Sequence, residues 1–269
     1  MHFKQIVGCL CALSLVGCVN KQKNVDHHVD VITSIKINGS NTALNGTYTL
    51  NYNKKGLVTS INSDATNLKK ADYTYDGTKI TQCAMQLEKS VHTHLYTYDD
   101  HDNIIKDDTK ELPSINRTYK YKYNNKKQIV RKDAKRGSAE TVTTYTYNSH
   151  GRVSHFDMRK VVKGKEEKYD ERDYLYDANG HFNRLTRQLY STTLSSKTQT
   201  VRSKNTYADG NLASMQYGSY SFTFNYITIV PSNEKACKTQ QDLILTDSAL
   251  NHRSPVNLLD MTWLISNDQ

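Results

Sequence analysis

Histidine and aspartate side chains crowd one short stretch, and these residue types suit metal binding. The stretch contains His92, His94, Asp99, Asp100, His101 and Asp102. A zinc site needs three or four converging ligands and partners that orient them. Alternation along a strand places His92 and His94 on one face, whereas His101 falls in the following turn. Nothing in this spacing makes the ligands converge, so we interpret them as exposed polar residues around a hairpin and expect no metal.

Tyrosine and lysine alternate in a second stretch, which could bind a glycan or another anionic ligand. Sugars pack on aromatic faces, and clustered lysines attract anions. The candidate ligand surface comprises Lys120, Tyr121, Lys122, Tyr123, Tyr145 and Tyr147. The alternative is structural: repeated tyrosines pack across strands, and lysines cover a solvated sheet face and protect its edges. We favour the structural interpretation and keep ligand binding as the functional hypothesis.

Motifs of recognised enzyme classes are missing from the sequence. There is no nucleophile elbow, phosphate-binding loop or paired-carboxylate arrangement. We therefore predict no catalytic residues, no cofactor and no enzymatic activity.

A repeated unit carries these side chains. Its clearest copy, residues 145–153, reads Tyr-Thr-Tyr-Asn-Ser-His-Gly-Arg-Val. Tyrosines two apart share one face of a strand, while the residue between them points to the other face. Asn or Asp then opens a turn, and glycine supplies a positive φ. Each unit is therefore a predicted β-hairpin. The second tyrosine of successive units is Tyr52, Tyr75, Tyr98, Tyr123, Tyr147, Tyr176 and Tyr207.

Two units depart from this pattern, because Asp102 and Lys127 occupy the glycine position. We expect these two turns to be looser or to be built differently.

Hairpins in series predict an all-β fold: one large antiparallel meander, strongly curved or closed into a soluble barrel-like sheet, with a short C-terminal helical segment. We expect a first strand over residues 31–37 and about fifteen more between residues 47 and 230. The repeat domain therefore spans residues 31–230, with no internal boundary.

The C-terminal residues 231–269 depart from the repeat, and we predict that they form a cover or plug of the same domain. Residues 243–245 could add a short strand, and Ser254-Pro255 looks like a helix start. Two cysteines remain outside the N-terminal region, Cys83 and Cys237. They could form a disulfide in an oxidising compartment, or they could be two separate buried thiols.

The N-terminus carries an export signal. Lys4 precedes an apolar stretch that has the length of a signal-peptide core and is too short to span a membrane. Leu15-Val16-Gly17-Cys18 resembles the bacterial lipobox, which implies removal of residues 1–17 and lipid attachment at Cys18. Residues 18–30 would form the lipidated N-terminus and a tether. Val19 replaces the aspartate that favours inner-membrane retention, so the resemblance implies the outer membrane. Whether the domain faces the periplasm or the cell surface stays open.

The repeat also resembles the YD repeat of Rhs-type proteins, which has Tyr-Asp or Tyr-Asn, two residues, Gly, one residue and a hydrophobic residue. With the lipobox, the chain resembles a family of bacterial lipoproteins of unknown function with a porin-like fold. The resemblance implies a curved or closed antiparallel sheet and no catalytic residues. Insertion of the sheet into a membrane is not expected, because the face opposite the tyrosines carries residues such as Thr97, Lys120 and Thr146.

The sequence therefore indicates a non-enzymatic outer-membrane lipoprotein, a β scaffold that binds an envelope or extracellular ligand. Its expected partners are the membrane, through the lipid anchor, and a glycan or other anionic envelope ligand; no nucleic acid is expected. The alternative is a structural or assembly factor for an outer-membrane protein complex. The net charge of +9 is compatible with either role.

Overall fold

A computed structural model describes residues 27–112, 116–176, 182–190 and 197–244. The predicted signal peptide, the lipid-attachment residue Cys18 and the helix start predicted at Ser254-Pro255 lie outside these residues and remain predictions.

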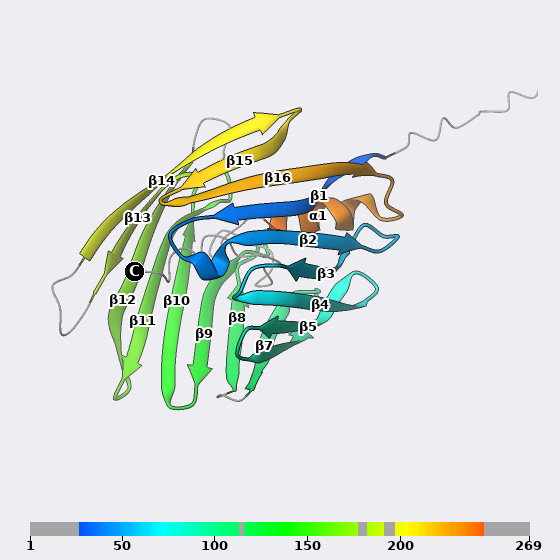
Figure 1. Cartoon of the computed structure of the whole chain (residues 1–269). Coiled ribbons are helices and arrows are strands. Elements are labelled where there is room, and N and C mark those ends of the chain that lie inside the picture. Colours follow the sequence, from blue (N-terminus) through cyan, green and yellow to red (C-terminus); the bar gives the residue numbers. More distant parts are fainter. Residues whose placement is uncertain (1–26, 113–115, 177–181, 191–196, 245–269) are drawn as a thin grey trace, which may run out of the picture.

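The described chain forms a closed antiparallel β-barrel of sixteen strands in which each strand pairs with its neighbours in sequence (Figure 1). This confirms the predicted all-β meander and decides between a curved sheet and a closed one. The strands are β1 (Val29–Asn38), β2 (Gly46–Tyr52), β3 (Val58–Ser63), β4 (Leu68–Asp76), β5 (Lys79–Leu87), β6 (Val91–Tyr98), β7 (Ile104–Leu112), β8 (Arg117–Tyr123), β9 (Ile129–Arg136), β10 (Ala139–Tyr147), β11 (Val153–Val162), β12 (Lys165–Tyr176), β13 (Phe182–Leu189), β14 (Lys197–Ala208), β15 (Asn211–Tyr217) and β16 (Tyr220–Ile229).

The barrel closes where the first strand meets the last. β1 pairs with β16 from Val29 opposite Ile229 to Asn38 opposite Ser221, and the register shifts once, between Ile32 and Ser34. Closure pairs every described strand on both sides, so none of them is an edge strand.

The inner face of the barrel wall is rich in tyrosine and aliphatic side chains, and the outer face is mostly polar. The first tyrosine of several units, such as Tyr73, Tyr121 and Tyr174, is buried, with at most 8% of its surface exposed. The residues between the tyrosine pairs, such as Lys122 and Thr146, are exposed. The predicted alternation is therefore correct, and the tyrosine face is the one that points inward.

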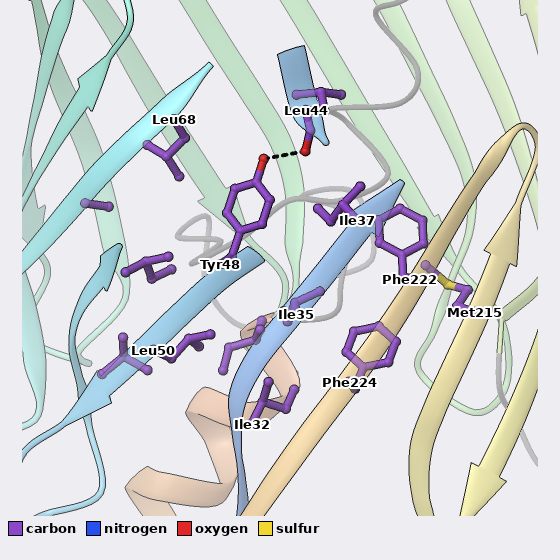
Figure 2. Close-up of a cluster of buried hydrophobic side chains, with 14 of the residues drawn as sticks. Ile32, Ile35, Ile37, Leu44, Tyr48, Leu50, Leu68, Met215, Phe222 and Phe224 are labelled. Carbon is purple, nitrogen blue, oxygen red and sulfur yellow. Dashed lines mark hydrogen bonds between the residues drawn. The ribbon is translucent and has the colours of Figure 1, made fainter. Parts of the chain in front are cut away.

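The most completely buried large side chains lie beside the seam. Ile35 on β1, Tyr48 on β2 and Phe222 on β16 are almost fully buried and belong to one cluster (Figure 2). A short 3-10 helix (Thr42–Leu44) joins β1 to β2, and the hydroxyl of Tyr48 donates a hydrogen bond of 2.9 Å to the carbonyl of Leu44. Burying side chains of this size contributes about 1.5–3 kcal/mol each, so the packing supports closure.

Four of the hairpin turns are built in the same way. In the turn after β2, the side-chain oxygen of Asn53 accepts hydrogen bonds from the backbone N–H groups of Lys55 and Leu57. The backbone N–H of Gly56 donates to the carbonyl of Asn53. The same bonds recur in the turns that begin at residues 99, 124 and 148.

The prediction that Asp102 and Lys127 mark different turns was wrong. Their φ angles are 65° and 59°, close to the 77° of Gly56 and the 76° of Gly151. The hydrogen bonds that the side chains of Asp99 and Asn124 accept from these turns hold both residues in the left-handed conformation, at a cost of about 1–2 kcal/mol each.

One α-helix, α1 (Glu234–Ile244), follows the last strand and packs against β1. The side chain of Asn233 accepts a hydrogen bond from the N–H of Ala236 and so caps the helix start. Residues 243 and 244 belong to this helix, so the strand predicted over residues 243–245 was wrong. Among the described residues, no helix is long and apolar enough to cross a bilayer.

The docking of α1 on the first turn makes Gly56 sensitive to substitution. A Cβ atom at residue 56 would lie 2.6 Å from the Sγ of Cys237 and 2.7 Å from the Cβ of Pro231, whereas one at Gly151 would meet only the Gln128 side-chain nitrogen, at 3.2 Å. We expect Gly56→Ala to lower the free energy of unfolding by about 2–4 kcal/mol and Gly151→Ala by about 1 kcal/mol. Urea unfolding of both variants measures the difference; equal losses would mean that α1 does not pack on this turn.

Candidate functional site

The end of the barrel that carries these four turns, called here the turn end, is ringed by tyrosine hydroxyl groups. The second tyrosine of six units, and Tyr226 on β16, each donate a hydrogen bond from the hydroxyl to a backbone carbonyl on a neighbouring strand, and we call each such bond a rung. The described rungs are Tyr52 to Ile32, Tyr75 to Val58, Tyr98 to Ile80, Tyr123 to Ile104, Tyr147 to Ile129, Tyr176 to Val153 and Tyr226 to Leu212, with oxygen–oxygen distances of 2.5 to 2.9 Å.

Every rung occupies the same place in the strand register. The ladder between β3 and β4 ends at the pair Ser60 and Asp72, and the rung carbonyl of Val58 lies two residues beyond it. The other rung carbonyls also lie two residues beyond the last pair of their ladder. A tyrosine hydroxyl therefore replaces a backbone donor where adjacent hairpins stop pairing, and each rung contributes about 0.5–1.5 kcal/mol.

Burial keeps these hydroxyl groups protonated. It raises the pKa of Tyr98 and Tyr226 to about 12, and it raises the pKa of Tyr75 and Tyr123 further in the same direction. The rung tyrosines are therefore neutral hydrogen-bond donors throughout the physiological range.

The predicted ligand surface does not form one site. Tyr121, Tyr123, Tyr145 and Tyr147 belong to the inward face, whereas Lys120 and Lys122 point outward and are exposed. The wall of the barrel separates the two groups because side chains alternate along each strand. The structural role of the tyrosines, which the sequence analysis favoured, is visible for Tyr123 and Tyr147 in their rungs.

A groove of about 560 Å³ lies at the turn end, between the turns that follow β8 and β10. The side-chain nitrogen of Asn124 donates a hydrogen bond to the side-chain oxygen of Gln128. The side-chain nitrogen of Gln128 donates one to the backbone carbonyl of Gly151. These bonds join the two turns and fix the groove's shape. The groove is lined by Asn124, Asn125, Lys126, Gln128, Tyr145, Thr146, Tyr147, Asn148 and Gly151.

The polar groups of the groove suit a hydroxylated or anionic ligand. Lys126 and Asn125 are exposed on its lip, and in the described part of the chain the ammonium group of Lys126 has no ion-pair partner. Other turn lysines are engaged: Lys55 donates to the carbonyl of Gly77, and Lys127 donates to that of His101. Lys126 is therefore a cation that a ligand in the groove can reach.

The histidine and aspartate stretch is divided between two places. His94 faces the interior, where its Nδ1 lies 3.0 Å from a carboxylate oxygen of Asp107 and 2.9 Å from the hydroxyl of Thr109. His101 and Asp99 lie in the turn after β6, where the Asp99 carboxylate accepts backbone hydrogen bonds. Among the residues that the structure describes, no group of three or more His, Cys, Asp or Glu side chains could hold a metal ion.

A second charged cluster inside the wall escaped the sequence analysis. The carboxylate of Asp170 binds the guanidinium groups of Arg172 and Arg187 at 2.8 and 2.9 Å, and all three residues are buried. Arg172 also lies over the ring of Phe156, with its guanidinium carbon 4.7 Å from the ring centre. The charged residues of β12 and β13 were the available signal, but the sequence did not distinguish inward from outward side chains.

The two cysteines are separate buried thiols, so the disulfide considered from the sequence is not formed. Cys83 lies on β5 in the interior, paired with Tyr73 and His94 on the adjacent strands, whereas Cys237 lies on α1 beside Gly56. Burial raises the pKa of the Cys83 thiol to about 12, which keeps it protonated.

The outer wall lacks the continuous apolar band that a lipid-embedded barrel requires, within the strands described. Its outward side chains include Thr49, Asp72, Thr74, Lys120, Lys122, Thr144 and Thr146. Two of the exposed apolar residues lie opposite charged ones: Leu95 is opposite Asp108, and Leu175 is opposite Arg184.

The fold, a closed antiparallel barrel, has a counterpart among solved structures. The described barrel aligns with the crystal structure of a porin-like protein from Bacteroides vulgatus ATCC 8482, with a TM-score of 0.54 and 11% identity over 73% of this chain and 99% of that chain. At this identity, the likeness concerns the fold alone.

Two further solved structures align less well. A porin-like protein from Bacteroides uniformis ATCC 8492 gives a TM-score of 0.45 with 13% identity over 73% of this chain and 96% of that chain. The Photorhabdus luminescens Tc holotoxin pore gives 0.32 with 10% identity over 67% of this chain and 14% of that chain. No protein-family model and no curated protein matches the sequence.

The rung tyrosines predict how stability depends on alkaline pH. Their pKa is higher in the folded chain than the value of about 10 in an unfolded chain, so the native state holds the phenolic protons more tightly. The contribution of the rung tyrosines to stability should be constant up to about pH 10 and fall as the pH rises towards 12.

Urea midpoints at pH 8, 10 and 11.5 measure this dependence. We expect Tyr226→Phe to be less stable at pH 8 and to lose less stability between pH 10 and 11.5 than the parent chain. If the variant loses as much stability as the parent chain between pH 10 and 11.5, the Tyr226 hydroxyl does not contribute to the pH dependence.

Proposed function

We propose that this chain is a non-enzymatic outer-membrane lipoprotein whose barrel binds an anionic glycan of the envelope or of the cell's surroundings. The anchor would be Cys18, after removal of residues 1–17, and residues 18–30 would tether the barrel to the lipid. The polar outer wall supports a barrel that stands in water beside the membrane. The porin-like fold is compatible with this location.

The groove at the turn end is the observation that carries the ligand hypothesis. It combines an exposed ammonium group at Lys126, amide groups such as that of Asn125, and a braced framework. Amides and hydroxyls fix sugar hydroxyl groups, and a cation selects carboxylated or sulfated sugars. The groove is formed by backbone turns whose shape the Asx hydrogen bonds determine, so it would require little rearrangement on binding.

The anchor is tested by fractionation. We expect the parent chain to incorporate radiolabelled palmitate and to sediment with outer membranes, because a lipidated cysteine adds buried methylene groups. Cys18→Ser should lose the label and leave the membrane fraction. Palmitate labelling of the serine variant would contradict attachment at this residue. Protease treatment of intact and lysed cells then tells whether the barrel faces outward or into the periplasm.

The groove is tested with heparin-derived hexasaccharide as an anionic probe. Lys126→Gln removes one charge-assisted hydrogen bond and should therefore weaken binding of the hexasaccharide by about tenfold. Lys54→Gln is the matched control, because Lys54 is exposed on the turn after β2 and lies outside the groove. Titration calorimetry in 50 and 300 mM salt should show weaker binding at the higher salt concentration.

Two results would count against this proposal. Equal losses in both lysine variants would mean diffuse attraction to a basic protein. No binding of the hexasaccharide or of a panel of acidic glycans, together with co-purification of an integral outer-membrane barrel, would favour the alternative role as a structural or assembly factor.

A further inference from the structure

Helix α1 already shows how the rungs bind a ligand group. The side-chain oxygen of Gln240 accepts a hydrogen bond of 2.7 Å from the backbone N–H of Val58, and its nitrogen donates one of 2.6 Å to the hydroxyl of Tyr75. Gln241 repeats the arrangement at the N–H of Ile32 and the hydroxyl of Tyr52, at 3.0 and 3.3 Å.

Each of these rungs is therefore a two-point receptor. The strand residue supplies a backbone N–H donor. The tyrosine hydroxyl donates its proton to the carbonyl of the same strand residue and accepts a proton from the ligand. A primary carboxamide carries an acceptor oxygen and an N–H₂ donor on one carbon atom, so it satisfies both points together.

The same receptor geometry recurs at the next two rungs. Ile80 and Ile104 stand two residues beyond the last pair of their ladders, as Val58 does, and their carbonyls accept from Tyr98 and Tyr123. The N–H and C=O of a strand residue point to the same side, so these N–H groups also face the rung.

Helix α1 makes no hydrogen bond to the N–H group of Ile80 or of Ile104. Both residues are buried, with 6% and 4% of their surface exposed, and buried backbone N–H groups are rarely left unpaired. Across the described residues, no side chain accepts a hydrogen bond from either N–H, and α1 bonds only to the first two rungs.

We propose that the rungs at Ile80–Tyr98 and Ile104–Tyr123 bind the side-chain carboxamides of asparagine or glutamine in a polypeptide segment. Adjacent rungs are two strands apart, about 9–10 Å, and the consecutive Gln240 and Gln241 span one such interval. A peptide with two neighbouring glutamines would span the interval between the Ile80–Tyr98 rung and the Ile104–Tyr123 rung. The acetamido group of a sugar is a trans secondary amide, which presents its N–H and C=O on opposite sides and cannot make both bonds. The proposal is independent of the groove.

The test is a titration of the full chain with the blocked dipeptide N-acetyl-Gln-Gln-methylamide, followed by ¹H–¹⁵N spectra. N-acetyl-Met-Met-methylamide is the matched control, since methionine has a similar length and no amide. We expect the glutamine peptide alone to move the amide resonances of Ile80 and Ile104 in a saturable manner.

Variants then locate the contact. Tyr98→Phe keeps the ring and removes the acceptor, so it should weaken binding of the glutamine peptide by about fivefold, the value of one hydrogen bond. Tyr226→Phe removes a rung at a distant position of the ring and should leave the affinity unchanged. Dispersed spectra of both variants verify that they are folded.

Equal shifts with the two peptides, or an affinity that Tyr98→Phe leaves unchanged, would overturn the proposal and leave the rungs with a purely structural role. If Tyr98→Phe does not fold, comparison of the two peptides on the parent chain still decides the question. A saturable response to N-acetylglucosamine at the same resonances would also refute it, because the geometry excludes secondary amides.

Discussion

The barrel depends on hydrogen-bond partners for the backbone carbonyls at the positions where adjacent hairpins stop pairing. Sixteen strands close into one wall, but the ladder between consecutive hairpins ends before the turn is reached. Carbonyls at these positions, such as those of Val58 and Ile80, are buried and would cost about 1–3 kcal/mol each if left unpaired. A tyrosine hydroxyl from the next unit reaches each of them, so the repeat spacing of the sequence is a hydrogen-bonding requirement.

The same constraint explains the polarity of the wall. A rung tyrosine must point inward to reach the neighbouring carbonyl, and its partner two residues earlier shares that face. The inner face therefore fills with aromatic rings, and residues such as Lys122 and Thr146 are left on the outer face. A membrane-spanning porin requires the opposite arrangement, a polar interior and an apolar outside. The described barrel thus combines a closed antiparallel topology with an inner face rich in tyrosine.

The rungs also connect architecture with recognition. Tyr52 and Tyr75 hold neighbouring hairpins together and at the same time accept hydrogen bonds from Gln241 and Gln240 of α1. A hydroxyl group can do both because it is a donor and an acceptor. A structural ring of this kind is therefore a row of binding points at the turn end, where the groove also lies.

The sequence by itself determined the hairpin repeat, the number of strands and the alternation of faces, because these follow from local periodicity and turn chemistry. Only the tertiary structure decided that the sheet closes, which face is the inside, and which groups meet across it. Asp170 with Arg172 and Arg187 looked like ordinary strand charges, and Asp102 and Lys127 looked like different turns. Helix α1 was mistaken in part for a strand because its short apolar run fits both structures. Such contacts depend on long-range register and burial, which no local pattern specifies.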